Sequence, residues 1–486
     1  MSNLAPVLCV FGTGSDVGKS WLTAGLCRIF HQDGVDVAPY KAQNMSNNAG
    51  VTLEGLEMGR AQIVQAQACG LQAHVDMNPL LLKPNTDKGA QVVALGRVLG
   101  TMQARDYFSG GMDARRGMVL AALDRLRMKH ELIVAEGAGS CAEVNLRDRD
   151  LVNFPVAHHA NATVLLVADI HRGGVFAQLA GSLEIMPPSD RALVKGLIVN
   201  RFRGDISLFE DGVAWLEQRT GLPVLGVVPW NRQARLEDED GLPTDALLDP
   251  PQPTGEGFHV GVLRLPHISN FTDFDALTRH GAQVHYLARP RDLSRYDLLI
   301  LPGTKNTRGD LRWLRAQGWE ARIQAYEGHI LGLCGGYQML GEAIEDPLGV
   351  EGDPGITAGL GLLPVHTTMA GEKTTRRAAG WLGAVPVQGY EIHVGRTRVQ
   401  GPSLLELDSG PEGCRQGRVL GSYLHGLLDG SAPIRELLGP MRPELSWPEL
   451  GSHEAWRQAQ LDLVGAHLRE NLDLARLEGW WVPKHG

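Results

Sequence analysis

The sequence predicts an α/β protein with two doubly wound domains. Short runs rich in Val, Ile and Leu alternate with helical patterns, and they lack polar alternation, as expected of parallel strands buried on both faces. The chain has 486 residues, which is too long for one ordinary hydrophobic core. The stretch 231–257 is acidic, then rich in Pro and Gly, and has no periodicity, which is typical of a linker. We therefore expect a first domain over 1–235, a linker over 236–256 and a second domain over 257–486.

Five strands are expected in the first domain, with a helix after the first of them. The strands are expected at 6–12, 131–137, 163–169, 194–200 and 223–229. Leu22, Leu26 and Ile29 share one face of the helix that follows Lys19, and Gly34 ends that helix. This alternation of strands and helices predicts a doubly wound sheet.

A second series of strands and helices follows the linker. Its strands are expected at 258–266, 296–303 and 328–336. Near the end of the chain, apolar residues at helical spacing predict an amphipathic helix that packs on the core. These residues are Leu461, Val464, Leu468, Leu472 and Ala475.

Composition restricts the class of protein. The net charge of −9 argues against a general nucleic-acid binder, which would carry a basic face. None of the six cysteines forms a C-x-x-C pair, which favours a reducing, intracellular compartment. The N-terminus lacks the features of a signal peptide, and no apolar run approaches transmembrane length. We expect a cytoplasmic protein without nucleic-acid or membrane partners, and a homo-oligomer is compatible with the sequence.

The segment VFGTGSDVGKSWL joins the first strand to the first helix and carries the end of a phosphate-binding loop. Backbone N–H groups around Gly18 would cradle phosphates, Lys19 would reach the outer ones, and Ser20 would hold Mg²⁺. The strict P-loop pattern requires glycine where Thr13 stands, and Gly12 lies one residue earlier. The alternative is a tight glycine turn without a ligand, but the strand before and the helix after favour ATP binding.

This shifted glycine resembles the GTxxxxVGK[ST] loop of the dethiobiotin synthetase-like ATPases, which implies that Gly12 and Thr13 also contact ATP. The related ParA/MinD-like switches would carry a signature lysine where Gly14 stands. By the same resemblance, Lys41 would face phosphates and Asn200 would contact adenine. The polar residues Gln43, Asn44 and Ser46 would line the site of a carboxylate substrate. The alternative for each of them is a polar loop without a ligand.

Carboxylates follow the strand at 131–137. Glu136 ends this strand, where its carboxylate could hold Mg²⁺ beside Ser20. Asp150, a little further on, is a candidate for binding the substrate, with a solvated charged loop as the alternative.

The segment HILGLCGGYQMLG predicts a nucleophile elbow in the second domain. Cys334 lies between glycines where a strand ends and a helix begins, which would expose the thiol and stabilise a thiolate. A thiol also needs a base, and His425 in GSYLHGLL is the candidate. Backbone N–H groups near Gly303, in LPGTKNT, and of Gly335 would form an oxyanion hole.

The order of these motifs resembles the class I glutamine amidotransferase domains. Many of them carry a glutamate two residues after the histidine, where Leu427 stands here, so the third member of the catalytic group stays open. In GYEIHVG, Glu391 is a candidate for a substrate-binding or orienting role, and Tyr390 for binding the substrate.

Longer segments across residues 4–430 resemble the cobyric acid synthase family of cobalamin biosynthesis. They include PYKAQNMSNN, EGAGSCAEVNL, RLPHISNFTDFDAL, LGLCGGYQMLG and GYEIHVGRT. The resemblance implies ATP, Mg²⁺, glutamine and a corrinoid polycarboxylate as ligands. It further implies amidation of the b, d, e and g carboxylates of adenosylcobyrinic acid a,c-diamide through acyl phosphates, with ammonia released at Cys334. His171 stands where the family usually has Asp, and Lys83, Arg147 and Arg149 are candidate contacts for the corrinoid.

Other functions are compatible with parts of this pattern. A related amidoligase, such as cobyrinic acid a,c-diamide synthase or an enzyme that amidates a cell-wall precursor, would share both domains. A ParA/MinD-like ATP switch with a degenerate amidotransferase domain is the alternative from another class. Both Cys334 and His425 are retained, which argues against degeneracy.

Overall fold

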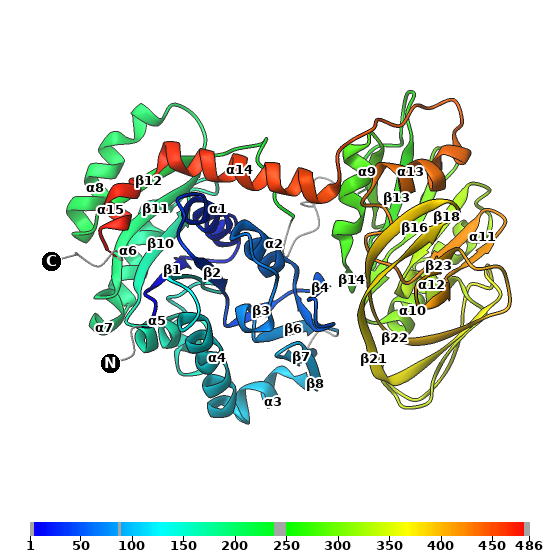
Figure 1. Cartoon of the computed structure of the whole chain (residues 1–486), viewed down its shortest axis with the longest axis horizontal. Coiled ribbons are helices and arrows are strands. Elements are labelled where there is room, and N and C mark those ends of the chain that lie inside the picture. The colour runs from blue at the N-terminus through cyan, green and yellow to red at the C-terminus, as the bar shows by residue number, and fades with distance from the viewer. Residues whose placement is uncertain (1–3, 86–88, 238–248, 481–486) are drawn as a thin grey trace.

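The computed structural model describes residues 4–85, 89–237 and 249–480 and confirms two α/β domains side by side (Figure 1). The first domain contains a six-stranded parallel sheet in the order β12-β11-β10-β1-β9-β2. Its strands are β1 (Val7–Gly12), β2 (Val37–Tyr40), β9 (Leu132–Glu136), β10 (Thr163–Asp169), β11 (Val194–Phe202) and β12 (Val224–Pro229). The five strands expected from the sequence are among them. Their near-continuous burial explains the absence of polar alternation.

Helices cover both faces of this sheet, as a doubly wound fold requires (Figure 1). They are α1 (Lys19–Gln32), α2 (Arg60–Ala68), α3 (Ala104–Ser109), α4 (Met112–Arg127), α5 (Phe154–Ala160), α6 (Val175–Ile185), α7 (Pro188–Arg191) and α8 (Glu210–Thr220). Leu22, Leu26 and Ile29 are fully buried on the inner face of α1, as their spacing predicts.

Between β2 and β9 the chain forms small sheets that the sequence analysis did not anticipate. Four strands are ordered β3-β6-β7-β8, and β4 pairs with β5. Their bounds are β3 (Gln43–Met45), β4 (Ala49–Val51), β5 (Glu57–Gly59), β6 (Leu80–Pro84), β7 (Gly89–Ala94) and β8 (Arg97–Gln103). Figure 1 places β4 at the side of the first domain that faces the second.

The second domain has its own sheet in the order β15-β13-β16-β18-β26-β25. Its strands are β13 (His259–Leu263), β15 (Gln283–Leu287), β16 (Leu298–Leu301), β18 (His329–Leu333), β25 (Cys414–Gln416) and β26 (Val419–Ser422). The three strands expected from the sequence are β13, β16 and β18. A short pair, β14 (Ile268–Ser269) with β17 (Gly303–Thr304), lies beside this sheet.

A second, mostly antiparallel sheet and several helices complete this domain. The strands are β19 (Ala343–Asp346), β20 (Gly355–Ala358), β21 (Val365–Leu382), β22 (Val385–Val399), β23 (Leu405–Leu407) and β24 (Gly410–Glu412). The helices are α9 (Asp275–Arg279), α10 (Thr307–Ala316), α11 (Trp319–Gln324), α12 (Gly335–Leu340) and α13 (Ser431–Leu438). Among the described residues, no helix combines the length and apolar character needed to span a membrane.

The C-terminal helix α14 (His453–Asn471) returns to the first domain (Figure 1). Val464 and Leu468 are fully buried and share a core cluster with Leu22 and Leu26 of α1. A Cβ at Gly25 would lie 2.4 Å from Leu468 Cδ1, so glycine permits the close approach of the two helices.

The ends of the expected elements differ in two places. The helical pattern that runs to Ala475 is broken, because α14 ends at Asn471 and Ala475 belongs to the short α15 (Leu474–Glu478). Residues 238–248 of the expected linker lie outside the described residues. Glu237, also placed in that linker, is buried and bonded to Arg60 of α2 and Arg457 of α14.

Candidate active sites

The loop between β1 and α1 is tightly turned and lies at the position of a phosphate-binding loop. Lys19 is 7% exposed, and its Nζ donates to the carbonyls of Gly14 at 2.8 Å and Gly139 at 2.9 Å. A Cβ at Gly12 would lie 2.7 Å from Val17 Cγ2, so the tight turn needs glycine at this shifted position. Gly18 has φ 94°, a left-handed conformation that glycine adopts without strain. The loop therefore presents its lysine and N–H groups at the start of α1, where phosphates bind.

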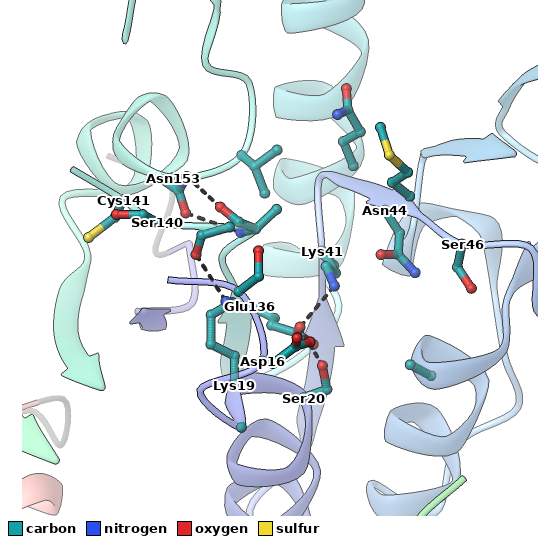
Figure 2. A pocket seen from close by; sticks show the side chains of 18 of the residues that line it. Asp16, Lys19, Ser20, Lys41, Asn44, Ser46, Glu136, Ser140, Cys141 and Asn153 are labelled. Carbon is teal, nitrogen blue, oxygen red and sulfur yellow. Dashed lines mark hydrogen bonds and ion pairs between the residues drawn. The ribbon is translucent and has the colours of Figure 1, made fainter. Parts of the chain in front are cut away.

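Glu136 is the centre of a polar cluster next to this loop (Figure 2). Its Oε1 accepts from Ser20 Oγ at 2.7 Å and Lys41 Nζ at 2.9 Å, and its Oε2 accepts from Gln65 Nε2 at 2.6 Å. Parallel pairing places Glu136 beside Val10, which explains how two distant strand ends meet. A hydroxyl and a carboxylate at this spacing fit Mg²⁺, which takes one or two protein oxygens together with phosphate oxygens.

The other polar residues predicted for this site line its wall. Asn44 Nδ2 donates to Gln62 Oε1 at 2.9 Å, and Tyr107 OH donates to Gln43 Oε1. Ser46 Oγ accepts from the backbone N–H of Asn48 at 3.0 Å. These contacts hold the segment 43–48 in one conformation beside the cavity (Figure 2).

Three further residues predicted to bind ATP or the substrate, Asp150, Asn200 and Thr13, make hydrogen bonds within the first domain. Asp150 accepts from the backbone N–H groups of Val152, Asn153 and Phe154 and so supports the start of α5. Asn200 Nδ2 donates to the carbonyl of Val17 at 2.8 Å and supports the phosphate loop. Thr13 Oγ1 donates to Gln178 Oε1 at 3.2 Å.

A cavity of about 2570 Å³ opens over this site, and its lining includes Arg264, Ile268 and Phe271 of the second domain. Among the described lining residues, eleven are Lys or Arg and six are Asp or Glu, although the whole chain carries a net negative charge. Arg147 and Arg149 line the cavity, as expected. The expectation for Lys83 is wrong: its side chain has no exposed surface and is ion-paired with Glu57, so it cannot contact a corrinoid.

Cys334 lies at the turn from strand to helix where the sequence predicts a nucleophile elbow. It lies between β18 and α12 with φ 50° and ψ −108°, a strained conformation for a residue other than glycine. A Cβ at Gly336 would lie 1.9 Å from the carbonyl oxygen of Leu301, so glycine lets α12 pack directly on β16. This close packing holds the thiol at the carboxyl end of the parallel sheet.

His425 is oriented by Asp273, the third member that the sequence left open. Its Nδ1 lies 2.7 Å from Asp273 Oδ2, and its ring stacks on Tyr390 with centroids 5.2 Å apart. Asn270 Nδ2 lies 3.2 Å from the other ring nitrogen, Nε2. Asn270 and Asp273 both belong to the SNFTDFD segment. The sequence analysis used this segment for the family resemblance but did not predict its contact with His425. Glu391 pairs instead with Arg376.

The electrostatics favour a thiolate on Cys334. Burial lowers the pKa of His425, but the charge and hydrogen bond of Asp273 outweigh it and raise this pKa to about 10. Burial likewise raises the pKa of the Cys334 thiol, but a hydrogen bond and charge from His425, with the charge of Lys305, bring it below its usual value. Both shifts favour a thiolate–imidazolium pair.

The two glycines predicted for the oxyanion hole lie at this pair. A Cβ at Gly303 would lie 3.6 Å from His425 Cε1, and one at Gly335 would lie 3.1 Å from the backbone N of Thr304. The backbone N–H of Gly335 also donates to Cys334. The two glycines therefore lie beside the imidazole and the thiol, as an oxyanion hole would require.

The fold and the two sites define a nucleotide-binding domain joined to a glutamine amidotransferase domain. Residues 8–244 match the family described as CobQ/CobB/MinD/ParA nucleotide binding domain. Residues 259–433 match the family described as CobB/CobQ-like glutamine amidotransferase domain.

Relatives of known name share both domains. A cobyric acid synthase of Chlorobium phaeobacteroides is 53% identical, over 90% of this chain and 92% of its own. One from Chlorobaculum tepidum is 51% identical, over 98% and 97%. One from Phocaeicola vulgatus is 47% identical, over 98% of each chain. The chain belongs to the cobyric acid synthase family.

Proposed function

We propose that this chain uses ATP and glutamine to amidate the b, d, e and g carboxylates of adenosylcobyrinic acid a,c-diamide, giving adenosylcobyric acid. The observation that carries the proposal is the cationic cavity beside the phosphate loop, shared with a domain that contains a Cys–His–Asp glutaminase site. Its relatives of the same length are named cobyric acid synthases.

The synthetase site would activate a carboxylate, which is a poor electrophile. A carboxylate oxygen attacks the γ-phosphorus of ATP, the bond to the leaving ADP oxygen breaks, and an acyl phosphate forms. Lys19 and Lys41 would stabilise the charge on the transferred group. Ser20 and Glu136 would hold Mg²⁺, which neutralises phosphate charge when bound. Ammonia then attacks the acyl carbon and phosphate leaves.

The glutaminase site would supply that ammonia. The Cys334 thiolate attacks the side-chain amide carbon of glutamine, and N–H groups at Gly303 and Gly335 hold the oxyanion. The C–N bond breaks as the His425 imidazolium gives its proton to the departing nitrogen, which leaves as NH₃. Water, deprotonated by His425, then hydrolyses the thioester to glutamate.

The size and charge of the cavity suit the proposed substrate. Ordinary ligand pockets hold roughly 300–1,000 Å³, whereas this cavity measures about 2570 Å³. It therefore has room for a corrinoid beside a nucleotide. The surplus of Lys and Arg in its lining would balance a triphosphate and several carboxylates.

The mass of the corrinoid after incubation with Mg·ATP and glutamine tests the proposal. We expect four successive additions of one amide each, dependent on both ATP and glutamine. Cys334→Ala should abolish the glutamine-dependent reaction but keep the reaction with ammonium. Cys414→Ala, in the same domain, should keep both. Intact glutaminase and ATPase activity without amidation of this corrinoid would refute the proposed substrate.

A further inference from the structure

Asn270 joins the histidine of the glutaminase site to the segment that lines the synthetase cavity. Its Nδ2 lies 3.2 Å from His425 Nε2, and its Oδ1 accepts from the backbone N–H of Ala49 at 3.0 Å. The next residue, Phe271, donates its N–H to Asn48 Oδ1 at 3.2 Å. Asn270 and His425 are 3% and 1% exposed, so water is excluded from these contacts.

Cys334 is connected to the same segment by a second route. Its Sγ lies 3.5 Å from the carbonyl oxygen of Ile392. The Ile392 side chain packs with Ala49, Leu81 and Val93 in a small apolar cluster that spans the two domains. Ala49 is therefore linked to both members of the glutaminase pair, through Asn270 to the histidine and through Ile392 to the cysteine.

The segment that ends at Ala49 also forms the wall of the cavity. Residues 43–47 line the cavity, and only Asn48 separates them from Ala49. Ligands that displace residues 43–47 would also move Asn48 and Ala49, because these residues follow directly in the sequence. The change would reach the side-chain amide of Asn270 at Oδ1, and the Nδ2 of the same amide contacts His425.

The backbone of Asn270 has a conformation that a test variant must preserve. Its φ is 52°, a left-handed conformation in which residues other than glycine are uncommon. Since Nδ1 of His425 is held by Asp273, Nε2 is the nitrogen left to exchange a proton with Cys334. The Asn270 amide lies beside that nitrogen, so a small movement of Asn270 changes how well the imidazole is aligned.

We propose that Asn270 is a positioning residue that couples the two sites, aligning His425 with Cys334 according to whether the cavity is occupied. The inference rests on the proposed function, because it assumes that the cavity holds the amidation substrates. Glutamine would then be hydrolysed fastest when ammonia has an acceptor.

The test is the rate of glutamate release with no ligand, with Mg·ATP, and with Mg·ATP plus the corrinoid diamide. In the unaltered protein we expect the ligands to raise this rate about fivefold or more, the lower end of allosteric coupling. Asn270→Gly keeps the left-handed backbone without strain and removes both side-chain bonds. Its rate should not respond to the ligands, while amidation driven by ammonium should persist.

Two further variants separate coupling from general weakening of the interface. Asn306→Asp removes another interdomain bond, from Asn306 Nδ2 to the carbonyl of Asn85 at 3.4 Å, but retains the oxygen that caps α10. It should respond to ligands like the unaltered protein. Asn48→Ala removes the bond from Phe271 and leaves both Asn270 bonds in place, so it should show a reduced response. It replaces Asn270→Gly if that variant does not fold.

The outcomes decide the inference separately from the proposed function. A full ligand response in Asn270→Gly, no response in the unaltered protein, or an equal loss in Asn306→Asp would overturn the coupling role of Asn270. If the corrinoid is not amidated, the proposed substrate fails. The comparison with Mg·ATP alone still decides the coupling in that case.

Discussion

The pKa of the Cys334 thiol depends on the groups around it rather than on the cysteine alone. The glycine-rich turn holds the thiol in a strained conformation, and His425 supplies the charge that lowers its pKa. Asp273 in turn keeps that imidazole charged, since its negative charge raises the pKa of His425 to about 10 after the opposing effect of burial. Removing the charge of Asp273 should therefore raise the pKa of Cys334, because His425 connects the two residues.

Replacing Asp273 with Asn tests this order of dependence. Loss of its charge lowers the pKa of His425, and a neutral imidazole then raises the pKa of Cys334. The acidic limb of the pH profile for glutamine hydrolysis should move to higher pH, and kcat/KM should fall by about 100-fold or more. Glutamate release measured across the neutral range checks this, with Asp275→Asn as the nearby control. An unmoved pH profile would show that another group orients the imidazole.

At the scale of elements, α14 completes the core of the first domain, although the whole second domain separates the two in sequence. The buried face of α14 packs on α1, and α1 begins directly after the phosphate loop. Exposed Asp462 and Arg469 add ion pairs with Arg28 and Asp33, and such surface pairs contribute little to stability. The helix should therefore stabilise the first domain through a few buried side chains.

Replacing Leu468 with Ala should destabilise the first domain by about 2–5 kcal/mol, because the side chain is fully buried against α1 and leaves a cavity. Leu463 is the matched control on the same helix, since it is 43% exposed. Leu463→Ala should leave unfolding nearly unchanged. Urea unfolding followed by circular dichroism measures both, and equal effects of the two substitutions would contradict the docked position of α14.

Across the whole molecule, buried charges link the two domains. Glu57 of the first domain is bonded to Lys83 of the same domain and to Lys373 of the second, the latter at 2.5 Å. Burial raises the pKa of Glu57, but the two lysines outweigh it and hold the pKa well below its usual range. Its stabilising effect is therefore complete at neutral pH and is lost only when strong acid protonates the carboxylate.

Glu57→Gln should destabilise the protein by about 3–5 kcal/mol, because it leaves buried lysines without their counter-charge. Glu372→Gln removes a charge from a side chain that is 91% exposed and should have almost no effect. The urea midpoint of each variant at neutral pH provides the comparison. A Glu57→Gln protein as stable as the unaltered one would mean that the lysines lose their protons instead.

The sequence by itself determined the features that depend on neighbouring residues. Strand and helix periodicity, the phosphate loop and the nucleophile elbow each need certain residue types at short spacing, because their backbone geometry is local. The two doubly wound domains could be predicted for this reason, and Cys334 and Lys19 could be selected as candidate site residues. Resemblance of longer motifs then indicated the family.

Only the tertiary structure decided which distant residues meet. Asp273 contacts a histidine 152 residues away, and no spacing rule connects the two. Lys83 looked like a surface cation but is buried by a hairpin of the other domain. The final helix follows the second domain in sequence and yet completes the core of the first. Such contacts depend on how sheets and domains pack against one another, and that packing arises from burial summed over the whole chain.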